Sequence, residues 1–221
     1  MSSASHPVEP ALPRPPLTRD RIVRAGIEQA DRIGVARLTM RGLASALDYE
    51  VMSLYNHVAN KADLLAGMVD GVAQGIGVPD PSGEWVHELR RSCVSTHETL
   101  ESHPWASSLW VSTMPGPARI AVMESWLQAL HSSGLDEQSA HRGFHAVSNH
   151  VVGYALQESN GLPVDAPDST ERAQGFLDGL DRAVYPRVIE HVQQHLDGDR
   201  IGGTFEFVLD LILAGLATSP E

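Results

Sequence analysis

Residues 38–58 read LTMRGLASALDYEVMSLYNHV, and this stretch decides the fold of the N-terminal part of the chain. Thr39 is placed to cap a short helix over 40–47, and residues 48–50 form a turn before a second helix from Val51 to about Val58. Apolar residues on one side of both helices can pack the pair together and onto a preceding helix: Leu43, Ala44, Leu47, Leu54 and Val58. The spacing therefore predicts a helix-turn-helix.

The outer face of this hairpin carries side chains that suit contact with DNA. Hydroxyl and amide groups on the second helix can bind base edges, and a methyl-bearing surface can contact thymine. Basic, hydroxyl and imidazole groups around it can bind phosphates. The predicted DNA-binding residues are Thr39, Arg41, Glu50, Val51, Met52, Ser53, Tyr55, Asn56, His57 and Lys61. A helical hairpin without DNA affinity would have a similar pattern, so these helices alone do not decide the function.

The segments around the hairpin complete an N-terminal domain. Residues 1–17 are rich in Pro, Ser and Ala, which predicts a disordered arm. Thr18 is placed to cap a first helix that Gly34 ends, and Asn60 to cap a later helix with Asp63 in its favourable first turn. Residues 75–83 are rich in glycine and proline, which predicts a linker between domains. We therefore predict a helix-turn-helix domain over 18–76 and a second domain over 83–218.

The second domain has helical spacing of its apolar residues. We expect helices at about 83–103, 104–111, 116–133, 136–160, 171–195 and 203–217, with a loop over 160–169. No segment alternates as a half-buried strand does, and no internal repeat is found. The predicted fold class is all-α, with an N-terminal three-helix helix-turn-helix domain and a larger helical domain.

The composition excludes several classes of protein. The 221-residue chain is 42% hydrophobic, yet no apolar run approaches the roughly 18 residues of a membrane span. Prolines occupy the positions where a signal peptide needs an apolar stretch. Cys93 is the only cysteine, so the chain has no internal disulfide. These features predict a cytoplasmic protein without a membrane partner.

The net charge of −12, taken alone, argues against a polyanionic partner. Its distribution reverses this argument. Residues 18–62 carry seven basic and five acidic side chains, whereas residues 63–221 carry eight basic and 22 acidic ones. A basic head on an acidic body indicates that one end of the molecule meets polyanions.

One run in the N-terminal domain is specific enough to indicate a family. Residues 54–65, with the pattern Leu-Tyr-x-His-Val-x-Asn-Lys-x-x-Leu-Leu, resemble the N-terminal domain of the tetracycline-repressor (TetR) family. The resemblance begins at residue 17 and continues more weakly at 114–117, 151–156 and 205–216. Asp48 stands where the family usually has Gly, but Asp tolerates a left-handed backbone, so the turn should persist. Glu50 adds a negative charge that should repel phosphate.

The resemblance implies a ligand-responsive transcription regulator that is not an enzyme. By family habit it is a repressor that binds a palindromic operator in double-stranded DNA as a homodimer, and a small-molecule effector releases it. Helices at about 136–160 and 203–217 should pair with those of a second copy. The interface residues it implies are Val151, Phe205, Val208, Leu209, Ile212, Leu213 and Leu216.

The resemblance also implies a ligand pocket among the helices at about 83–160. The expected pocket residues are His97, Trp105, Leu109, Trp110, Met114, Trp126, Phe144, His145, Ser148, Asn149, Val152 and Gln157. Such a mainly apolar set with a few polar groups suits a small-molecule site, although each large residue could equally be plain core. Tetracycline is not expected, because the positions that match its contacts supply no matching histidine.

Other interpretations stay open at this point. The chain could be an activator, a regulator without a ligand, or a dimerisation module with an inactive head. It could also be a helical enzyme that uses its His-rich helix, where His141 and His145 share one face as metal ligands can. No third ligand completes that set, so no metal or cofactor is predicted. The absence of a Gly-rich phosphate loop, a nucleophile elbow and an HExxH pattern argues against an enzyme.

Overall fold

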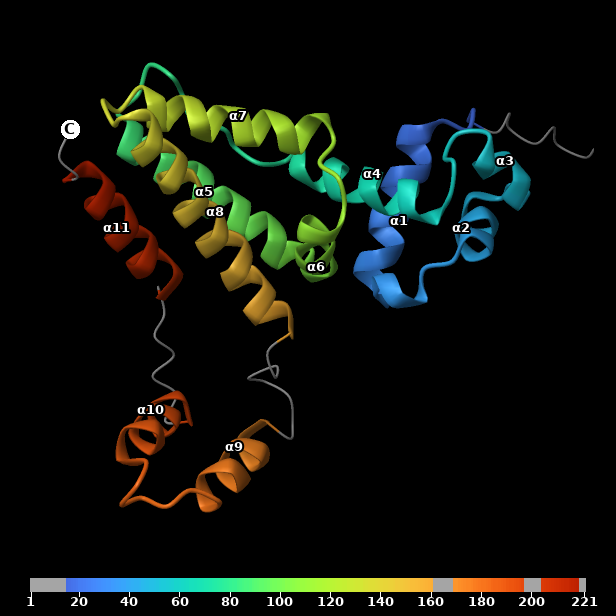
Figure 1. The fold of residues 1–221 in the computed structure, drawn as a ribbon. Coiled ribbons are helices and arrows are strands. Elements are labelled where there is room, and N and C mark those ends of the chain that lie inside the picture. Colours follow the sequence, from blue (N-terminus) through green and yellow to red (C-terminus); the bar gives the residue numbers. More distant parts are fainter. Residues whose placement is uncertain (1–14, 161–168, 197–203, 219–221) are drawn as a thin grey trace, which may run out of the picture.

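The computed structural model of the chain describes residues 15–160, 169–196 and 204–218. These residues form eleven α-helices and one short 3-10 helix and contain no strand, so the predicted all-α class is confirmed. Figure 1 shows two parts that meet along α4 (Lys61–Ala73) and a helical pair that stands apart from them. Residues 15–76 are called the head, and residues 77–160 with 204–218 the body.

The head begins with α1 (Arg19–Ile33) and η1 (Val35–Arg37), followed by α2 (Met40–Leu47) and α3 (Val51–Tyr55). The three predicted N-caps are confirmed. The side-chain oxygens of Thr18, Thr39 and Asn60 each accept a hydrogen bond from the backbone N–H three residues on, at 3.2, 3.0 and 2.9 Å. Each bond satisfies an N–H that a helix start leaves unpaired, so the helix starts are fixed locally.

The turn of the helix-turn-helix depends on Asp48. Its backbone is left-handed, with φ 59°, and its N–H donates to the carbonyls of Ala44 and Ser45. The expectation that Asp would tolerate this conformation is confirmed. The helix that follows is shorter than predicted, because the chain turns at residues 56–57 while Val58 stays buried.

Buried apolar side chains hold the head together and continue into the body. Ile22 of α1, Leu43 of α2 and Leu54 of α3 have no exposed surface. The same cluster includes Trp105 of α6 (Pro104–Ser112), whose indole N–H donates to the Asp31 carboxylate on α1 at 2.6 Å. The head and the body therefore share a packed apolar contact.

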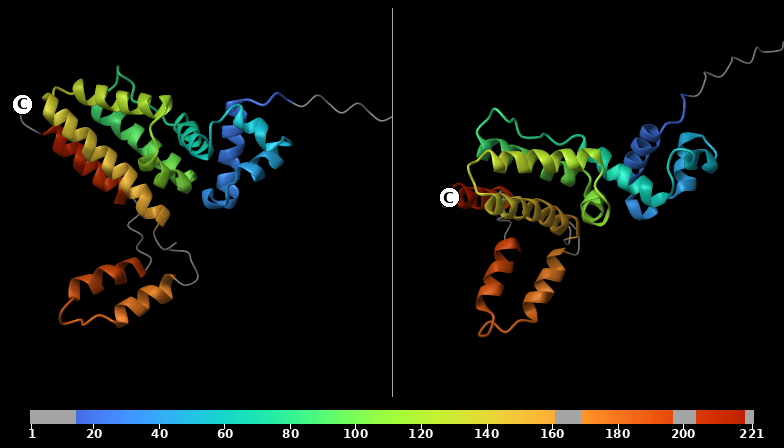
Figure 2. Two further views of the ribbon diagram at one scale, coloured as in Figure 1. Left: turned by 45° about the vertical axis from the view of Figure 1, so that its right-hand side comes forward. Right: turned by 45° about the horizontal axis from the view of Figure 1, so that its top comes forward.

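In the body, four helices lie side by side: α5 (Trp85–Ser102), α7 (Pro117–His131), α8 (Glu137–Asn160) and α11 (Thr204–Ala217), as Figures 1 and 2 show. The central helix, α8, contacts α5, α6, α7 and α11. Pro104 and Pro117 stand in the first turns of α6 and α7, where a missing N–H costs nothing. These bounds agree with the predicted helices to within a few residues.

The single helix predicted over 171–195 is wrong. The structure has two helices there, α9 (Ser169–Asp178) and α10 (Pro186–Leu196), which pack on each other and project from the body (Figure 2). Gly179 weakens helix continuation, and Pro186 cannot donate a backbone hydrogen bond to the preceding turn. The Asp181 side chain then accepts the N–H of Ala183, which stabilises the turn between the helices.

Two further predictions fall mainly on residues that lie outside the described part of the chain. These are the arm over 1–17, of which residues 1–14 are outside, and the loop over 160–169, of which residues 161–168 are outside. Among the described helices, none is long and apolar enough to cross a membrane.

Candidate functional site

The outer end of the head presents α3 to solvent, far from the body (Figure 1). The Met52 side chain is 69% exposed and that of Tyr55 is 40% exposed, while Leu54 between them is buried. The structure brings most of the predicted DNA-binding residues to the surface at this end. Exposed are Thr39, Arg41, Glu50, Met52, Tyr55, Asn56, His57 and Lys61, and partly buried are Val51 and Ser53.

An ion pair fixes the end of α3 against the rest of the head. Arg19 donates to both carboxylate oxygens of Asp63, at 2.9 and 2.6 Å, and also to the carbonyl of His57 at 3.3 Å. Asp63 accepts a further bond from the N–H of Ala59 at 2.8 Å. The Arg19 guanidinium, and then this N–H, hold the pKa of Asp63 below its usual value. The sequence predicts Asp63 only as a first-turn residue of its helix, because nothing in the sequence pairs it with Arg19.

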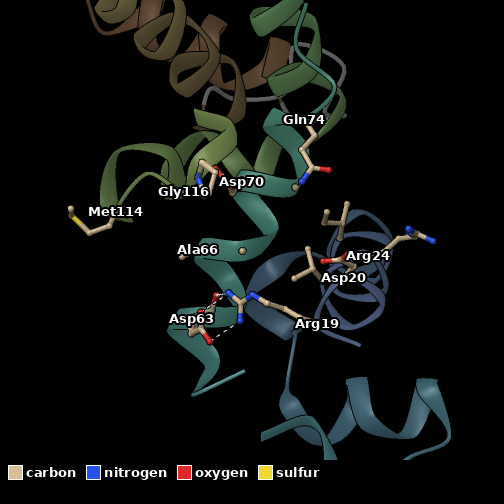
Figure 3. A pocket seen from close by; sticks show the side chains of 14 residues that line it. Arg19, Asp20, Arg24, Asp63, Ala66, Asp70, Gln74, Met114 and Gly116 are labelled. Atoms are coloured by element: carbon tan, nitrogen blue, oxygen red, sulfur yellow. Dashed lines mark hydrogen bonds and ion pairs between the residues drawn. The ribbon is translucent and has the colours of Figure 1, made fainter. Parts of the chain in front are cut away.

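Helix α4, which carries Asp63, carries a second carboxylate, Asp70, that contacts the body. A cleft of about 550 Å³ runs along α4, between α1 and the segment that joins α6 to α7; Figure 3 shows the side chains that line it. At its inner end, Asp70 accepts hydrogen bonds from the N–H groups of Ala118 and Arg119, at 3.2 and 3.0 Å. Asp70 on α4 therefore caps the first turn of α7. A side chain at Gly116 would collide with this carboxylate, which explains the glycine.

A cavity of about 300 Å³ lies in the body, beside the start of α7. Its walls come from α5, α6, α7, α8 and the segment between α6 and α7: Thr96, Trp110, Val111, Thr113, Met114, Pro115, Arg119, Val122, Met123, Trp126, Phe144, Ser148 and Val152. Six of the residues expected in the pocket are among them: Trp110, Met114, Trp126, Phe144, Ser148 and Val152. Three of these, Phe144, Ser148 and Val152, follow one face of α8 at intervals of four.

The other expected pocket residues lie elsewhere. Trp105 and Leu109 pack toward the head. The His97 ring stacks on Phe205 with centroids 4.0 Å apart, and its Nε2 lies 2.8 Å from a Glu158 carboxylate oxygen. Three residues of α8 are exposed and do not line the cavity: His145, Asn149 and Gln157. The helix is predictable from the sequence, but the face on which each of these residues lies is not.

Arg119, which is only 2% exposed, also lines the cavity and is not among the residues expected there. Its guanidinium donates to the carbonyls of Trp110 at 2.9 Å, Thr113 at 3.3 Å and Met114. The centre of the guanidinium lies 5.6 Å from the Trp110 ring. A signal was available, because Arg119 is the only formally charged residue between positions 104 and 123.

The residues expected at a dimer interface divide between two faces. Val151, Phe205, Leu209 and Leu213 are buried within the core of the chain itself, and Val208, Ile212 and Leu216 are partly buried. The apolar side chains that α11 leaves in solvent are instead Phe207, 63% exposed, and Leu211, 58% exposed. Four of the expected residues therefore hold α11 to its own body in this conformation.

The histidines of α8 point in different directions. The rings of His141 and His145 meet edge to face, with centroids 4.6 Å apart. His150 turns to the other side, where its Nε2 lies 2.8 Å from the carbonyl of Phe205. Across residues 15–160, 169–196 and 204–218, no group of three His, Cys, Asp or Glu side chains is placed to hold a metal ion.

A family model described as the tetracyclin repressor-like C-terminal domain matches residues 78–219, most of the chain beyond the head. The chain belongs to the TetR family. The resemblance inferred from residues 54–65 is thereby confirmed from the other end of the molecule.

Individual relatives of the TetR family agree. An HTH-type transcriptional regulator of Saccharopolyspora erythraea is 36% identical over 156 residues, 69% of this chain and 66% of that protein. The class G tetracycline repressor of Vibrio anguillarum is 27% identical over 203 residues, 90% of this chain and 93% of that protein. The crystal structure of the Streptomyces coelicolor TetR family protein ActR with actinorhodin has a TM-score of 0.79 and 30% identity, covering 93% of this chain and 100% of that one. The chain is a transcription regulator of this family.

Proposed function

We propose that this TetR-family protein is a repressor that binds palindromic operator DNA as a homodimer and is released by a small molecule. One observation carries the proposal: the single helix α4 is hydrogen-bonded near one end to Arg19 and the segment after α3, and near the other end to α7, which lines the cavity. Asp63 holds Arg19 and the segment after α3, and Asp70 holds the first turn of α7. A ligand that changes the cavity wall would therefore change the position of the head.

The exposed face of α3 is the proposed DNA-reading surface. Met52, Ser53 and Asn56 would contact base edges in the major groove, since they combine a methyl group, a hydroxyl and an amide. Around them, side chains that can bind phosphate would set the register: Thr39, Arg41, Tyr55, His57 and Lys61. Glu50 and Val51 begin the helix and would lie beside the groove.

The proposed dimer forms through α8 and α11 of two copies. Phe207 and Leu211 lie four residues apart on α11, so they share one face, and large exposed apolar side chains of this kind mark interaction surfaces. A two-fold dimer would present two copies of α3 to half-sites one helical turn apart or a multiple of it.

Known relatives support the direction of regulation. The repressor DrrR1 of Streptomyces coeruleorubidus is 32% identical over 149 residues, and several tetracycline repressors are also similar. ActR has been crystallised with small molecules bound. The proposed effector would release DNA by favouring a head spacing that does not fit the operator. No catalytic role is proposed.

The test is binding of the purified protein to fluorescent fragments of the DNA upstream of its own gene, at low and moderate salt. We expect a specific complex whose affinity falls steeply with salt, because phosphate contacts release counterions. If no fragment binds, a genome-wide selection of bound DNA follows. Failure of that selection as well would overturn the proposed function.

A further inference from the structure

Arg119 is an unusual residue to find in the wall of a cavity. The side chain is almost fully buried, and it lies among apolar residues of α6, α7 and α8. Its two terminal nitrogens are used on the carbonyls at the end of α6 and the start of the next segment. Its Nε is buried and has no hydrogen-bond partner among the described residues. A buried donor without a partner is uncommon and calls for an explanation.

The positive charge of Arg119 is also incompletely balanced. Within the described residues, no carboxylate lies within ion-pair distance of its guanidinium. The carboxylate that acts electrostatically on Arg119 is Asp70, whose oxygens already accept the backbone N–H groups of Ala118 and Arg119. Burial lowers the pKa of Arg119, yet an arginine stays protonated in proteins. The cavity wall therefore holds a cation that carbonyl dipoles, the Trp110 ring and the more distant Asp70 stabilise, without a carboxylate in direct contact.

The rest of the cavity wall suits a flat aromatic molecule. Trp110, Trp126 and Phe144 supply ring faces and edges, and Met114 and Met123 supply adaptable thioethers. Two of the hydroxyls in the wall, Thr96 and Thr113, already donate to carbonyls of their own helices, at 2.8 and 2.7 Å. Of the residues that line this wall, only Arg119 carries a formal charge.

We propose that the effector is a flat aromatic compound with an acidic oxygen, a carboxylate or phenolate, and that Arg119 binds this oxygen. In the described conformation Nε is not accessible from the cavity, so the ligand would first displace the guanidinium. Its oxygen would then accept the Nε–H and balance the buried charge, while the rings lie against the tryptophans. This inference rests on the proposed role of the cavity as the effector site. It adds the chemical class of the ligand and the residue that selects it.

The proposal also gives ligand binding a direct route to the head. The backbone N–H of Arg119 is one of the two that Asp70 of α4 accepts. A ligand that shifts the Arg119 side chain acts on the carbonyls of the segment after α6 and on the first turn of α7 together. Recognition and transmission would thus depend on the same residue.

The experiment compares two probes of nearly equal shape, anthraquinone-2-carboxylate and its uncharged carboxamide. Binding to the full chain is followed by quenching of tryptophan fluorescence, because Trp110 and Trp126 line the cavity. We expect the carboxylate to bind the wild type at least about tenfold more tightly than the carboxamide, as a hydrogen bond to a charged group would give. Equal affinity of the two probes, or binding of neither, would overturn the proposal without any variant.

Two variants locate the preference. Arg119→Gln should bind both probes equally, whereas Arg142→Gln, which removes an exposed arginine of α8, should keep the wild-type preference. Circular dichroism checks that both variants fold. A preference that survives in folded Arg119→Gln would refute the role of Arg119. Operator binding is measured separately, so a protein that binds DNA but shows no preference refutes only this inference.

Discussion

At the scale of single residues, two carboxylates of α4 have different partners and different duties. Asp63 pairs with Arg19 and supports the segment after α3, while Asp70 caps a helix of the body. They are seven residues apart, two helical turns, so they lie on the same side of α4. Because the two carboxylates have different partners, each can be substituted separately, and each substitution has its own expected result.

Removing the cap at Asp70 should destabilise the protein. In Asp70→Ala, the N–H groups of Ala118 and Arg119 lose their acceptor, and loss of a helix cap costs about 1 kcal/mol in the free energy of unfolding. Urea unfolding measures this change. Asp20→Ala is the matched control, because Asp20 is exposed and lines the same cleft. Equal stability of the two variants would contradict the capping role.

The bonds to Asp63 should make the stability of the head depend on pH. The folded state holds the pKa of this carboxyl below its unfolded value, chiefly through Arg19. The stabilisation is therefore complete above the ordinary carboxyl pKa and is lost as the pH falls through the lowered value. Thermal unfolding between neutral and acid pH should show a shallower acid loss in Asp63→Asn than in the wild type. Asp20→Asn should keep the wild-type slope, and an unchanged slope in Asp63→Asn would refute the assignment.

At the scale of the elements, α3 is the part that should contact DNA. Tyr55→Ala and Lys61→Ala should each weaken operator binding, since Tyr55 is exposed at the end of α3 and Lys61 is exposed at the start of α4. For Lys61→Ala, the slope of log affinity against log salt should fall by about 1, because one phosphate contact is lost. Arg187→Ala on α10, an exposed arginine far from the head, should leave both quantities unchanged. Wild-type DNA binding by both head variants would refute the assigned surface.

Local signals predicted the elements well, and three-dimensional packing decided the rest. Caps such as Thr18 and Thr39 act within one turn, so the sequence alone places them. Gly179 and Pro186 mark the break between α9 and α10, but the helical spacing of apolar residues continues across it, so this spacing alone predicts one helix. The position of Arg119 in a cavity wall depends on five segments that meet only in the folded chain.

The face of α11 shows the same limit more sharply. This helix is apolar nearly all round, so its sequence predicts two packing partners without saying which stripe meets which. The structure assigns Leu209 and Leu213 to the core of the chain and leaves Phe207 and Leu211 exposed. Arg90 marks a third edge, where its guanidinium bonds to Glu206 at 2.6 Å and Asp210 at 2.7 Å. Only the packed structure distinguishes the buried stripe, the exposed apolar stripe and the ion-paired side of α11.

At the scale of the whole molecule, this separation makes the proposed dimer testable. Leu211→Asp places a charge on the exposed apolar stripe, where a second copy of the chain would have to desolvate it. The variant should therefore be monomeric by light scattering while keeping its helical circular dichroism. It should also lose most of its operator affinity, because two linked heads bind a two-fold site far more tightly than one.

Leu209→Asp is the informative contrast, since it lies two positions away on the same helix but is buried within its own chain. A buried unpaired charge costs several kcal/mol, so this variant should unfold rather than dissociate. The pair of variants thus distinguishes the stripe that holds the fold from the stripe that holds the dimer. A dimeric mass for Leu211→Asp at micromolar concentration would mean that the copies pair through another surface. The next residues to change would then be Phe176 of α9 and Tyr185 of the segment before α10, both of which are exposed.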